Sequence, residues 1–261
     1  MRLIVLLKDM PDLSEIKVDS ETRTPRLEGV KRRISDLDKR ALEAAIKVKE
    51  AAGGEVVALS MGDEKTRTSM LEALAVGADA AYVVDDPGFR GLDANATSVV
   101  LEAAVRKIGG YDLIVSGEMT LDSLGSQVGP RVAELLDLPQ ITYAKAVTVA
   151  DGKVRAVRDL EDMDEVVEAD LPALVTVVRE INEPRIPSLM NIMKAKKKPQ
   201  TVWAAHDLSL DPAWVQAISH VKVLRVTAPK VERKQIRVEA DTAEEAAAKL
   251  VAHLVKEGIL Q

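Results

Sequence analysis

The strongest constraint on the fold of this 261-residue chain is a regular alternation of apolar runs with amphipathic helical patterns. Residues 3–7 form an unbroken apolar run, which is typical of a strand buried on both faces of a parallel sheet. The expected strands are 3–7, 55–61, 80–84, 113–116 and 141–149, and the expected helices are 38–52, 64–76, 94–108 and 127–136. Because helices join successive strands in this order, the sequence predicts an α/β fold with a doubly wound, mostly parallel Rossmann-like sheet.

The pattern changes near residue 147, where short runs of β-forming residues replace the alternation with helices. Asp151-Gly152 is a strong hairpin signal, because these two residue types adopt the positive φ angles that tight two-residue turns require. We therefore expect an antiparallel extension of the sheet. Its expected strands are 147–149, 153–160 and 165–169, and the apolar run 171–178 is expected to close it.

We expect two parts in the chain: residues 1–199 as a nucleotide-binding α/β domain, and residues 200–261 as a C-terminal arm with a final helix. The arm is too long and too sparsely patterned for a compact second domain, so we expect it to pack on another polypeptide. Trp203 and Trp214 fit such an interface, although two tryptophans packed on their own domain would give the same sequence. A capping box that begins at Thr242 marks the start of the final helix.

The composition excludes several classes of site and partner. A net charge of −6 argues against nucleic acid as a partner, and aromatic residues, at 2 %, are too few to build a base-stacking platform. The chain has no cysteine, which excludes disulfides and thiolate chemistry. No segment approaches the roughly 20 apolar residues that span a bilayer, so we expect a cytoplasmic protein. His206, His220 and His253 lack the spacing of metal ligands, and we expect no metal site.

Residues 182–199, NEPRIPSLMNIMKAKKKP, combine an apolar group with a dense cluster of lysines, and we name them the docking segment. Pro184 and Pro187 each fix φ and remove a backbone donor, so the first residues should form a stiff exposed loop before a short helix. Apolar groups beside positive charge suit transient docking on an acidic partner, because charge steers the encounter while a buried side chain anchors it. A solvated basic turn whose leucine packs on its own domain fits the same spacing.

The loop after the strand 113–116 is the best candidate for binding a small molecule. In open α/β sheets, ligands bind at the carboxyl ends of the strands. Gly125, Ser126 and Gly129 allow close approach of the backbone, and the following helix presents free N–H groups with a positive dipole end, which suits phosphate. The loop matches neither the Walker A lysine pattern nor the GxGxxG motif, and a plain helix-capping loop would look the same.

Several segments in one order resemble a single known family. They include RLIVLLKDMPD, ALEAAIKVKE, VVALSMGDEK, ALAVGADAAYVVDD, SGEMTLDSLGSQVGPRVAELLDLPQITYA and, within the docking segment, NEPR and NIMKAKKK. An ordered match over roughly residues 1–200 is far more specific than any short motif. On these residues the chain is identified as a member of the electron transfer flavoprotein β-subunit family, which includes FixA. The resemblance implies an adenine-nucleotide α-hydrolase-like version of the Rossmann-like fold.

The resemblance implies an electron carrier subunit with no catalytic residue of its own. In the simpler family members, the β subunit binds AMP in a structural role and completes an FAD site held mainly by the α subunit of a heterodimer. The implied cofactor-binding residues are Leu6, Ser35, Asp36, Leu37, Asp38, Met61, Gly117, Glu118, Met119, Thr120, Leu121, Asp122, Ser123, Leu124, Gly125, Ser126, Gln127 and Val128.

The resemblance also implies a role for the docking segment. Leu189 matches the family's anchor leucine, which inserts into a pocket on an acyl-CoA dehydrogenase. The implied partners are acyl-CoA or other flavin dehydrogenases as donors and a quinone oxidoreductase as acceptor. The implied docking residues are Glu183, Pro184, Arg185, Leu189, Met190, Ile192, Met193, Lys194 and Lys197.

A second branch of the family performs electron bifurcation and binds a second FAD in place of AMP. Its loop usually reads DGDTAQ, whereas this chain has DSLGSQ at 122–127, so Leu124 and Gly125 replace a polar pair near the flavin's diphosphate. We therefore expect AMP, with a bifurcating subunit that oxidises NADH as the alternative. A stand-alone nucleotide-binding module, which would be a stable monomer, is a third possibility from the fold alone.

Overall fold

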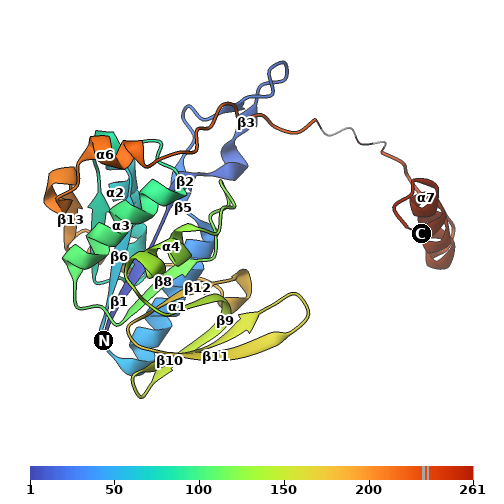
Figure 1. Cartoon of the computed structure of the whole chain (residues 1–261). Coiled ribbons are helices and arrows are strands. Elements are labelled where there is room, and N and C mark those ends of the chain that lie inside the picture. The colour runs from blue at the N-terminus through green and yellow to red at the C-terminus, as the bar shows by residue number, and fades with distance from the viewer. Residues whose placement is uncertain (231–232, 234, 261) are drawn as a thin grey trace.

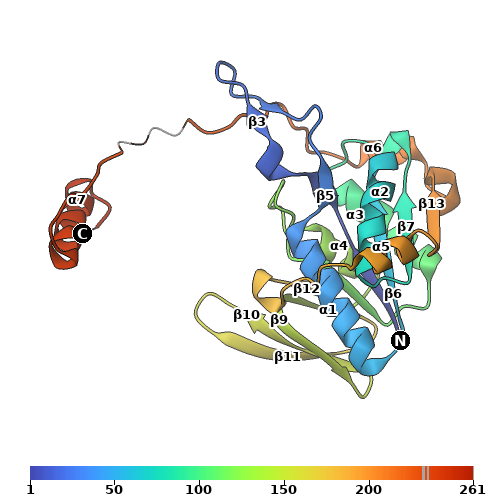
Figure 2. The same ribbon diagram turned by 180° about the vertical axis from the view of Figure 1, so that it is seen from behind.

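The computed structural model describes residues 1–230, 233 and 235–260. Its described residues form a nine-stranded sheet with helices on both faces, which confirms the expected doubly wound α/β class. One face carries α3 (Ala94–Ile108), α4 (Val128–Leu135) and α6 (Pro212–Ala217), as Figure 1 shows. Figure 2 shows the opposite face, which carries α1 (Asp36–Ala52), α2 (Glu64–Val76) and α5 (Leu189–Ala195).

The centre of the sheet is parallel and aliphatic. β1 (Arg2–Leu6) pairs with β6 (Glu55–Met61) on one side and β8 (Leu113–Gly117) on the other. Leu3 and Val5 join the apolar cluster beneath α1 and α2, while Ile4 and Leu6 join the cluster beneath α3 and α4. Burial of both faces explains the unbroken apolar run. The full strand order is β11–β10–β9–β12–β8–β1–β6–β7–β13, with β7 at Ala80–Val84 and parallel pairing at every step from β9 to β13.

The expectation that residues 171–178 close the antiparallel extension is wrong. The run forms β12 (Ala173–Val177), which lies inside the sheet between β8 and β9 and pairs parallel with both. All of its residues are buried. An uninterrupted apolar sequence suits an internal strand covered on both faces, so burial, rather than the order of the chain, decides where this strand lies.

The antiparallel extension itself is confirmed. It consists of β9 (Gln140–Ala150), β10 (Lys153–Asp159) and β11 (Asp164–Asp170), each paired antiparallel with its neighbour in the chain. Asp151 and Gly152 form the two-residue turn between β9 and β10 with φ values of 51° and 74°. Both angles are positive, as the favoured hairpin turn requires.

Residues 200–217 form part of the sheet domain, which therefore extends past the expected boundary at residue 199. β13 (Gln200–Trp203) pairs parallel with β7, and η4 (Ala205–Leu208) and α6 follow it. Leu208 and Val215 are buried against the core on the α3 face. Trp203 packs against Tyr82 of β7 with ring centroids 4.6 Å apart, so this tryptophan packs on its own domain. The expectation that the rest of the arm packs on another polypeptide stays a prediction.

The remaining elements are small or peripheral. α7 (Ala243–Lys256) begins at Thr242, whose hydroxyl accepts the N–H of Glu245 at 3.2 Å, and its apolar residues Leu250 and Val251 are exposed. Two short antiparallel pairs and three 3₁₀ turns complete the fold: β2 (Asp9–Pro11) with β5 (Arg32–Ile34), β3 (Lys17–Val18) with β4 (Pro25–Arg26), η1 (Leu13–Glu15), η2 (Pro87–Phe89) and η3 (Arg179–Ile181).

Candidate functional site

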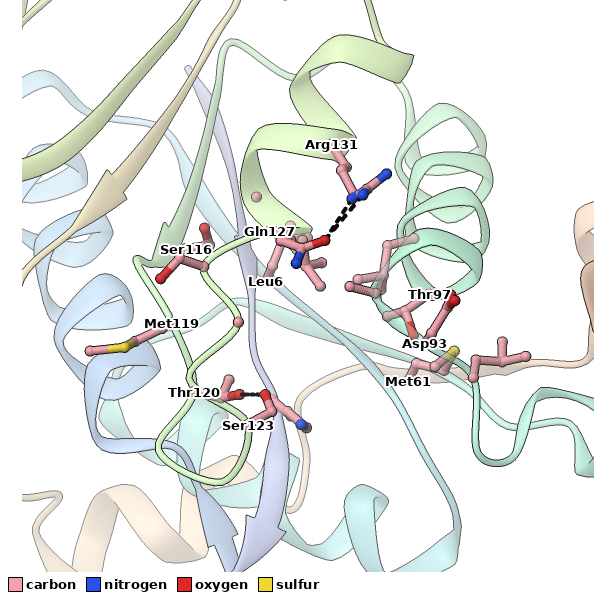
Figure 3. A pocket seen from close by; sticks show the side chains of 18 of the residues that line it. Leu6, Met61, Asp93, Thr97, Ser116, Met119, Thr120, Ser123, Gln127 and Arg131 are labelled. Carbon is pink, nitrogen blue, oxygen red and sulfur yellow. Dashed lines mark hydrogen bonds between the residues drawn. The ribbon is translucent and has the colours of Figure 1, made fainter. Parts of the chain in front are cut away.

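A cleft of about 520 Å³ lies at the carboxyl ends of the central strands (Figure 3). Leu6 at the end of β1, Met61 at the end of β6 and Ser116 in β8 line it. The direction of strand addition reverses here, because β6 and β7 lie on one side of β1 while β8 and β12 lie on the other. Ligands of open α/β sheets bind at such a reversal, so the cleft occupies the expected place for a ligand.

One wall of the cleft is the loop between β8 and α4. The hydroxyls of Thr120 and Ser123 lie 3.0 Å apart within hydrogen-bonding distance, as the dashed line in Figure 3 shows. Lys8 Nζ reaches Asp122 at 2.8 Å and ties the loop to the end of β1. Leu124 and Ser126 both have φ of 51°, a left-handed conformation that costs a non-glycine residue on the order of 1 kcal/mol. The surrounding contacts therefore impose a defined loop shape.

The start of α4 offers unpaired donors beside a close-packed strand. Gln127 is the N-cap and makes no side-chain cap, and the first N–H groups of a helix lack intrahelical partners. A Cβ on Gly129 would lie 2.8 Å from Ser116 Oγ and 3.0 Å from Thr176 Cγ2, so glycine lets the helix begin close to β8. Ser116 Oγ is buried and has no hydrogen-bond partner within the described part of the chain. A phosphate oxygen would satisfy both the helix amides and this hydroxyl.

The opposite wall is the start of α3 together with part of the C-terminal arm. Arg131 of α4 donates to Gln127 Oε1 and to Asn95 Oδ1, both at 3.1 Å, which joins the two walls. Asp93, the N-cap of α3, also accepts the N–H groups of His220 at 2.8 Å and Val221 at 3.1 Å. The cleft therefore has a second lobe, beyond the loop, in which the arm takes part.

Asp38 in the first turn of α1 holds the ends of β1 and β8 together at the cleft. Its carboxylate accepts the N–H of Lys8 at 2.7 Å and the N–H of Gly117 at 3.1 Å. The side chain is buried, and its removal from water raises the pKa of Asp38 to about 7, although both N–H bonds favour the charged form. The carboxyl group therefore titrates near neutral pH.

The structure brings most of the implied cofactor-binding residues together. Those that line the cleft are Leu6, Asp38, Met61, Gly117, Glu118, Met119, Thr120, Ser123, Gly125, Ser126, Gln127 and Val128. The other six do not line it. Ser35, Asp36 and Leu121 border a separate pocket of about 210 Å³, Leu37 is buried, Asp122 pairs with Lys8, and Leu124 is exposed.

Sequence reasoning missed the second lobe. Its lining residues are Phe89, Gly91, Leu92, Asp93, Ala94, Asn95, Thr97, Leu101, Arg131, Val221 and Val223. The only signal was Asp93 before a helical pattern, which is an ordinary helix start and carries no hint of a ligand. Lys8, which follows the expected first strand and is a candidate for that reason, also lines the cleft.

The docking segment presents its apolar residues to solvent. Leu189 is 77 % exposed, and Ile186, Met190 and Met193 are also exposed. Ala195, in contrast, is buried in the core on the α1 and α2 face. In the isolated chain, Leu189 therefore does not pack on its own domain, which excludes the alternative of a basic turn with a packed leucine.

Two kinds of feature are absent from residues 1–230, 233 and 235–260. These residues contain no group of His, Asp and Glu side chains that could hold a metal ion. No helix within the same ranges has the length and apolar character that crossing a membrane requires.

The comparisons with known proteins agree with one another. The model of the family described as "Electron transfer flavoprotein domain" matches residues 27–208. The electron transfer flavoprotein subunit beta of Thermoanaerobacterium thermosaccharolyticum is 40 % identical over 89 % of this chain and 90 % of its own length. Subunit CarD of the caffeyl-CoA reductase-Etf complex of Acetobacterium woodii is 37 % identical over all of both chains. Protein FixA of Sinorhizobium fredii is 35 % identical over 98 % of this chain and 92 % of its own length.

The titration of Asp38 predicts a pH-dependent contribution to stability. Its pKa in the folded state, about 7, lies above the ordinary aspartate value of 3.8, so the folded state holds the proton more tightly. The stabilisation that this proton provides is lost as the pH rises to about 7. Relative to Asp38→Asn, the free energy of unfolding of the wild type should fall by about 1.4 kcal/mol per pH unit as the pH rises toward 7, which amounts to roughly 3 kcal/mol between pH 5 and pH 8.

Urea unfolding of both proteins at pH 5, 6, 7 and 8 measures this difference. Asp36→Asn is the matched control, because the Asp36 carboxylate is half-exposed and pairs with Arg33 at the surface, and its difference from the wild type should stay constant. A pH-independent difference for Asp38→Asn would contradict a buried carboxyl that titrates near neutrality.

Proposed function

The chain belongs to the electron transfer flavoprotein β-subunit and FixA family, and we propose that it is one half of a cytoplasmic heterodimer that relays electrons. Its partner would be an α subunit that holds most of an FAD site, which this chain completes. Electrons would enter from acyl-CoA or other flavin dehydrogenases and leave to a quinone-linked acceptor. A flavin, when bound, supplies reversible one- and two-electron chemistry, and this chain's residues bind and position.

The observation that carries the nucleotide part of the proposal is the start of α4. Its free amides, the cradle at Gly129 and the unpartnered Ser116 hydroxyl suit the phosphate of an adenine nucleotide. Lys8 lies beside the same loop, where its ammonium group pairs with Asp122. We propose AMP as the first candidate, in a structural role that fills the cleft and ties the strand ends together.

The second lobe favours a second candidate, FAD in place of AMP. The lobe continues the cleft to Asn95 and Thr97 of α3 and to Val221 and Val223 of the arm, past the start of α4. A mononucleotide bound by its phosphate at α4 would leave this lobe to solvent, whereas a dinucleotide would occupy both lobes. In that case the heterodimer would oxidise NADH and divide the electrons between two acceptors.

Counting nucleotides separates the two candidates. The chain should be purified with its co-expressed α subunit and denatured, and the released nucleotides should be separated and quantified. One AMP and one FAD per heterodimer support the simple carrier, and two FAD support the bifurcating subunit. Release of a single nucleotide per heterodimer would contradict a nucleotide in this cleft.

We further propose that Leu189 anchors the docking segment on the reducing dehydrogenase. Leu189→Ala removes an exposed apolar side chain and should slow reduction of the heterodimer by about tenfold. The measurement is stopped-flow reduction by an acyl-CoA dehydrogenase that has been reduced with its acyl-CoA substrate. Leu135→Ala, the same change at a half-exposed leucine of α4, is the control and should leave the rate unchanged. Equal rates for both variants and unaltered nucleotide content would remove the docking role.

A further inference from the structure

The docking segment is fastened to α1 through one arginine. Arg185 Nε donates to Glu43 Oε2 at 2.7 Å, and its Nη2 donates to Glu43 Oε1 at 3.0 Å. The same guanidinium reaches Glu50, two turns further along α1, at 2.6 Å and 3.0 Å. The backbone N–H of Arg185 also donates to Glu43 Oε2, at 3.3 Å. We name Arg185, Glu43 and Glu50 the clamp.

The burial of Glu43 shows that this carboxylate depends on Arg185 as its partner. Its side chain is only 4 % exposed, and a buried carboxylate is strongly unfavourable without a partner. Arg185 supplies that partner in the two-pronged geometry that a guanidinium makes with a carboxylate. Hydrogen bonds to Glu50 and Glu43 raise the pKa of Arg185, and Arg185 in turn lowers the pKa of Glu50. The guanidinium of Arg185 therefore binds residues of α1.

Further contacts hold both ends of the segment. Before the clamp, Glu183 pairs with Arg40 at 3.2 Å, and Asn182 Nδ2 donates to the carbonyl of Arg40 at 3.0 Å. At the end of α5, Ala195 is buried, and after α5 Lys198 Nζ donates to two carbonyls at the end of α2. Lys198 is therefore also occupied within the domain. Between these anchors lie the exposed residues Ile186, Leu189, Met190 and Met193.

We propose that Arg185 is a positioning residue, which acts through Glu43 to hold Leu189 and its apolar neighbours in the conformation that the partner binds. This inference rests on the proposed docking function and assigns Arg185 a different role from the partner contact that the family resemblance implied. A segment that is ordered before it meets its partner loses less conformational entropy on binding. Pro184 and Pro187 beside the clamp reduce this loss further, because they restrict the backbone of the free segment.

The clamp and the exposed lysines make different predictions about salt. Glu43 and Glu50 surround the Arg185 charge, so this residue adds little to the positive field that steers an acidic partner. Removing a steering lysine lowers the association rate mainly at low ionic strength, since salt screens exposed charges. Removing a positioning residue lowers the rate at every ionic strength, because the anchor is then misplaced.

The test uses the heterodimer with Arg185→Gln and with the double variant Arg185→Gln/Glu43→Gln. The double variant removes the clamp without leaving a buried unpaired carboxylate, which limits the loss of stability. Arg106→Gln is the matched control, because it makes the same charge change on α3, in an Arg106–Glu102 pair remote from the segment. Lys197→Met is the steering control.

Two readouts keep the clamp and the docking function separate. The first is the rate of trypsin cleavage after Lys194, Lys196 and Lys197, which needs no partner and reports opening of the segment. The second is the rate of reduction by the substrate-reduced acyl-CoA dehydrogenase at 20 mM and 300 mM salt. We expect about tenfold faster cleavage and about tenfold slower reduction at both salt concentrations for the clamp variants. In a Leu189→Ala background the clamp variants should slow reduction no further, because both act through the same anchor.

The outcomes are distinct. Unchanged cleavage in the clamp variants overturns the clamp itself. If the clamp variants are cleaved faster but reduced at the wild-type rate, while Leu189→Ala is reduced more slowly, the positioning role is overturned. If Leu189→Ala is also reduced at the wild-type rate, the docking function itself is removed. A loss of rate confined to low salt, as expected for Lys197→Met, would make Arg185 a steering charge and contradict the inference.

Discussion

The central physical constraint in this protein is the placement of charged residues on α1, a helix that packs against the sheet. Ala41 and Ala45 pack against the sheet with no exposed surface, which fixes the helix on β1 and β8. Asp38 at its first turn binds the ends of those strands where the cleft opens. Glu43 and Glu50 extend from it to Arg185 of the docking segment. One rigid helix therefore sets both the floor of the cleft and the support of the docking segment.

The two buried carboxylates of α1 offset the cost of removing a charge from water in different ways. Asp38 receives two backbone N–H groups, and burial dominates, so its pKa rises to about 7. Glu43 is buried to a similar degree and receives a full positive charge in bidentate geometry from Arg185. The first arrangement joins strand ends and leaves a group that titrates near neutral pH. The second joins two segments that are 142 positions apart in sequence, because the Arg185 guanidinium pairs with the buried Glu43 carboxylate.

Much of the fold followed from the sequence because periodicity is a local property. The apolar run at residues 3–7, the helical pattern at residues 38–52 and the Asp151-Gly152 turn each depend on neighbouring residues alone. The position of β12 did not follow, because an internal strand and a closing strand differ in their spatial neighbours. The loop wall of the cleft was predictable for the same local reason. The second lobe and the true contacts of Arg185 depend on residues that only the folded chain brings together.

A crystal structure of the co-purified heterodimer shows directly what the cleft holds. We expect an adenine nucleotide whose phosphate lies at the start of α4, within hydrogen-bonding distance of Ser116 Oγ and the amides that follow Gln127. An occupied cleft in which Ser116 and α4 make no phosphate contact, or a nucleotide bound elsewhere on this chain, would overturn the proposed nucleotide site.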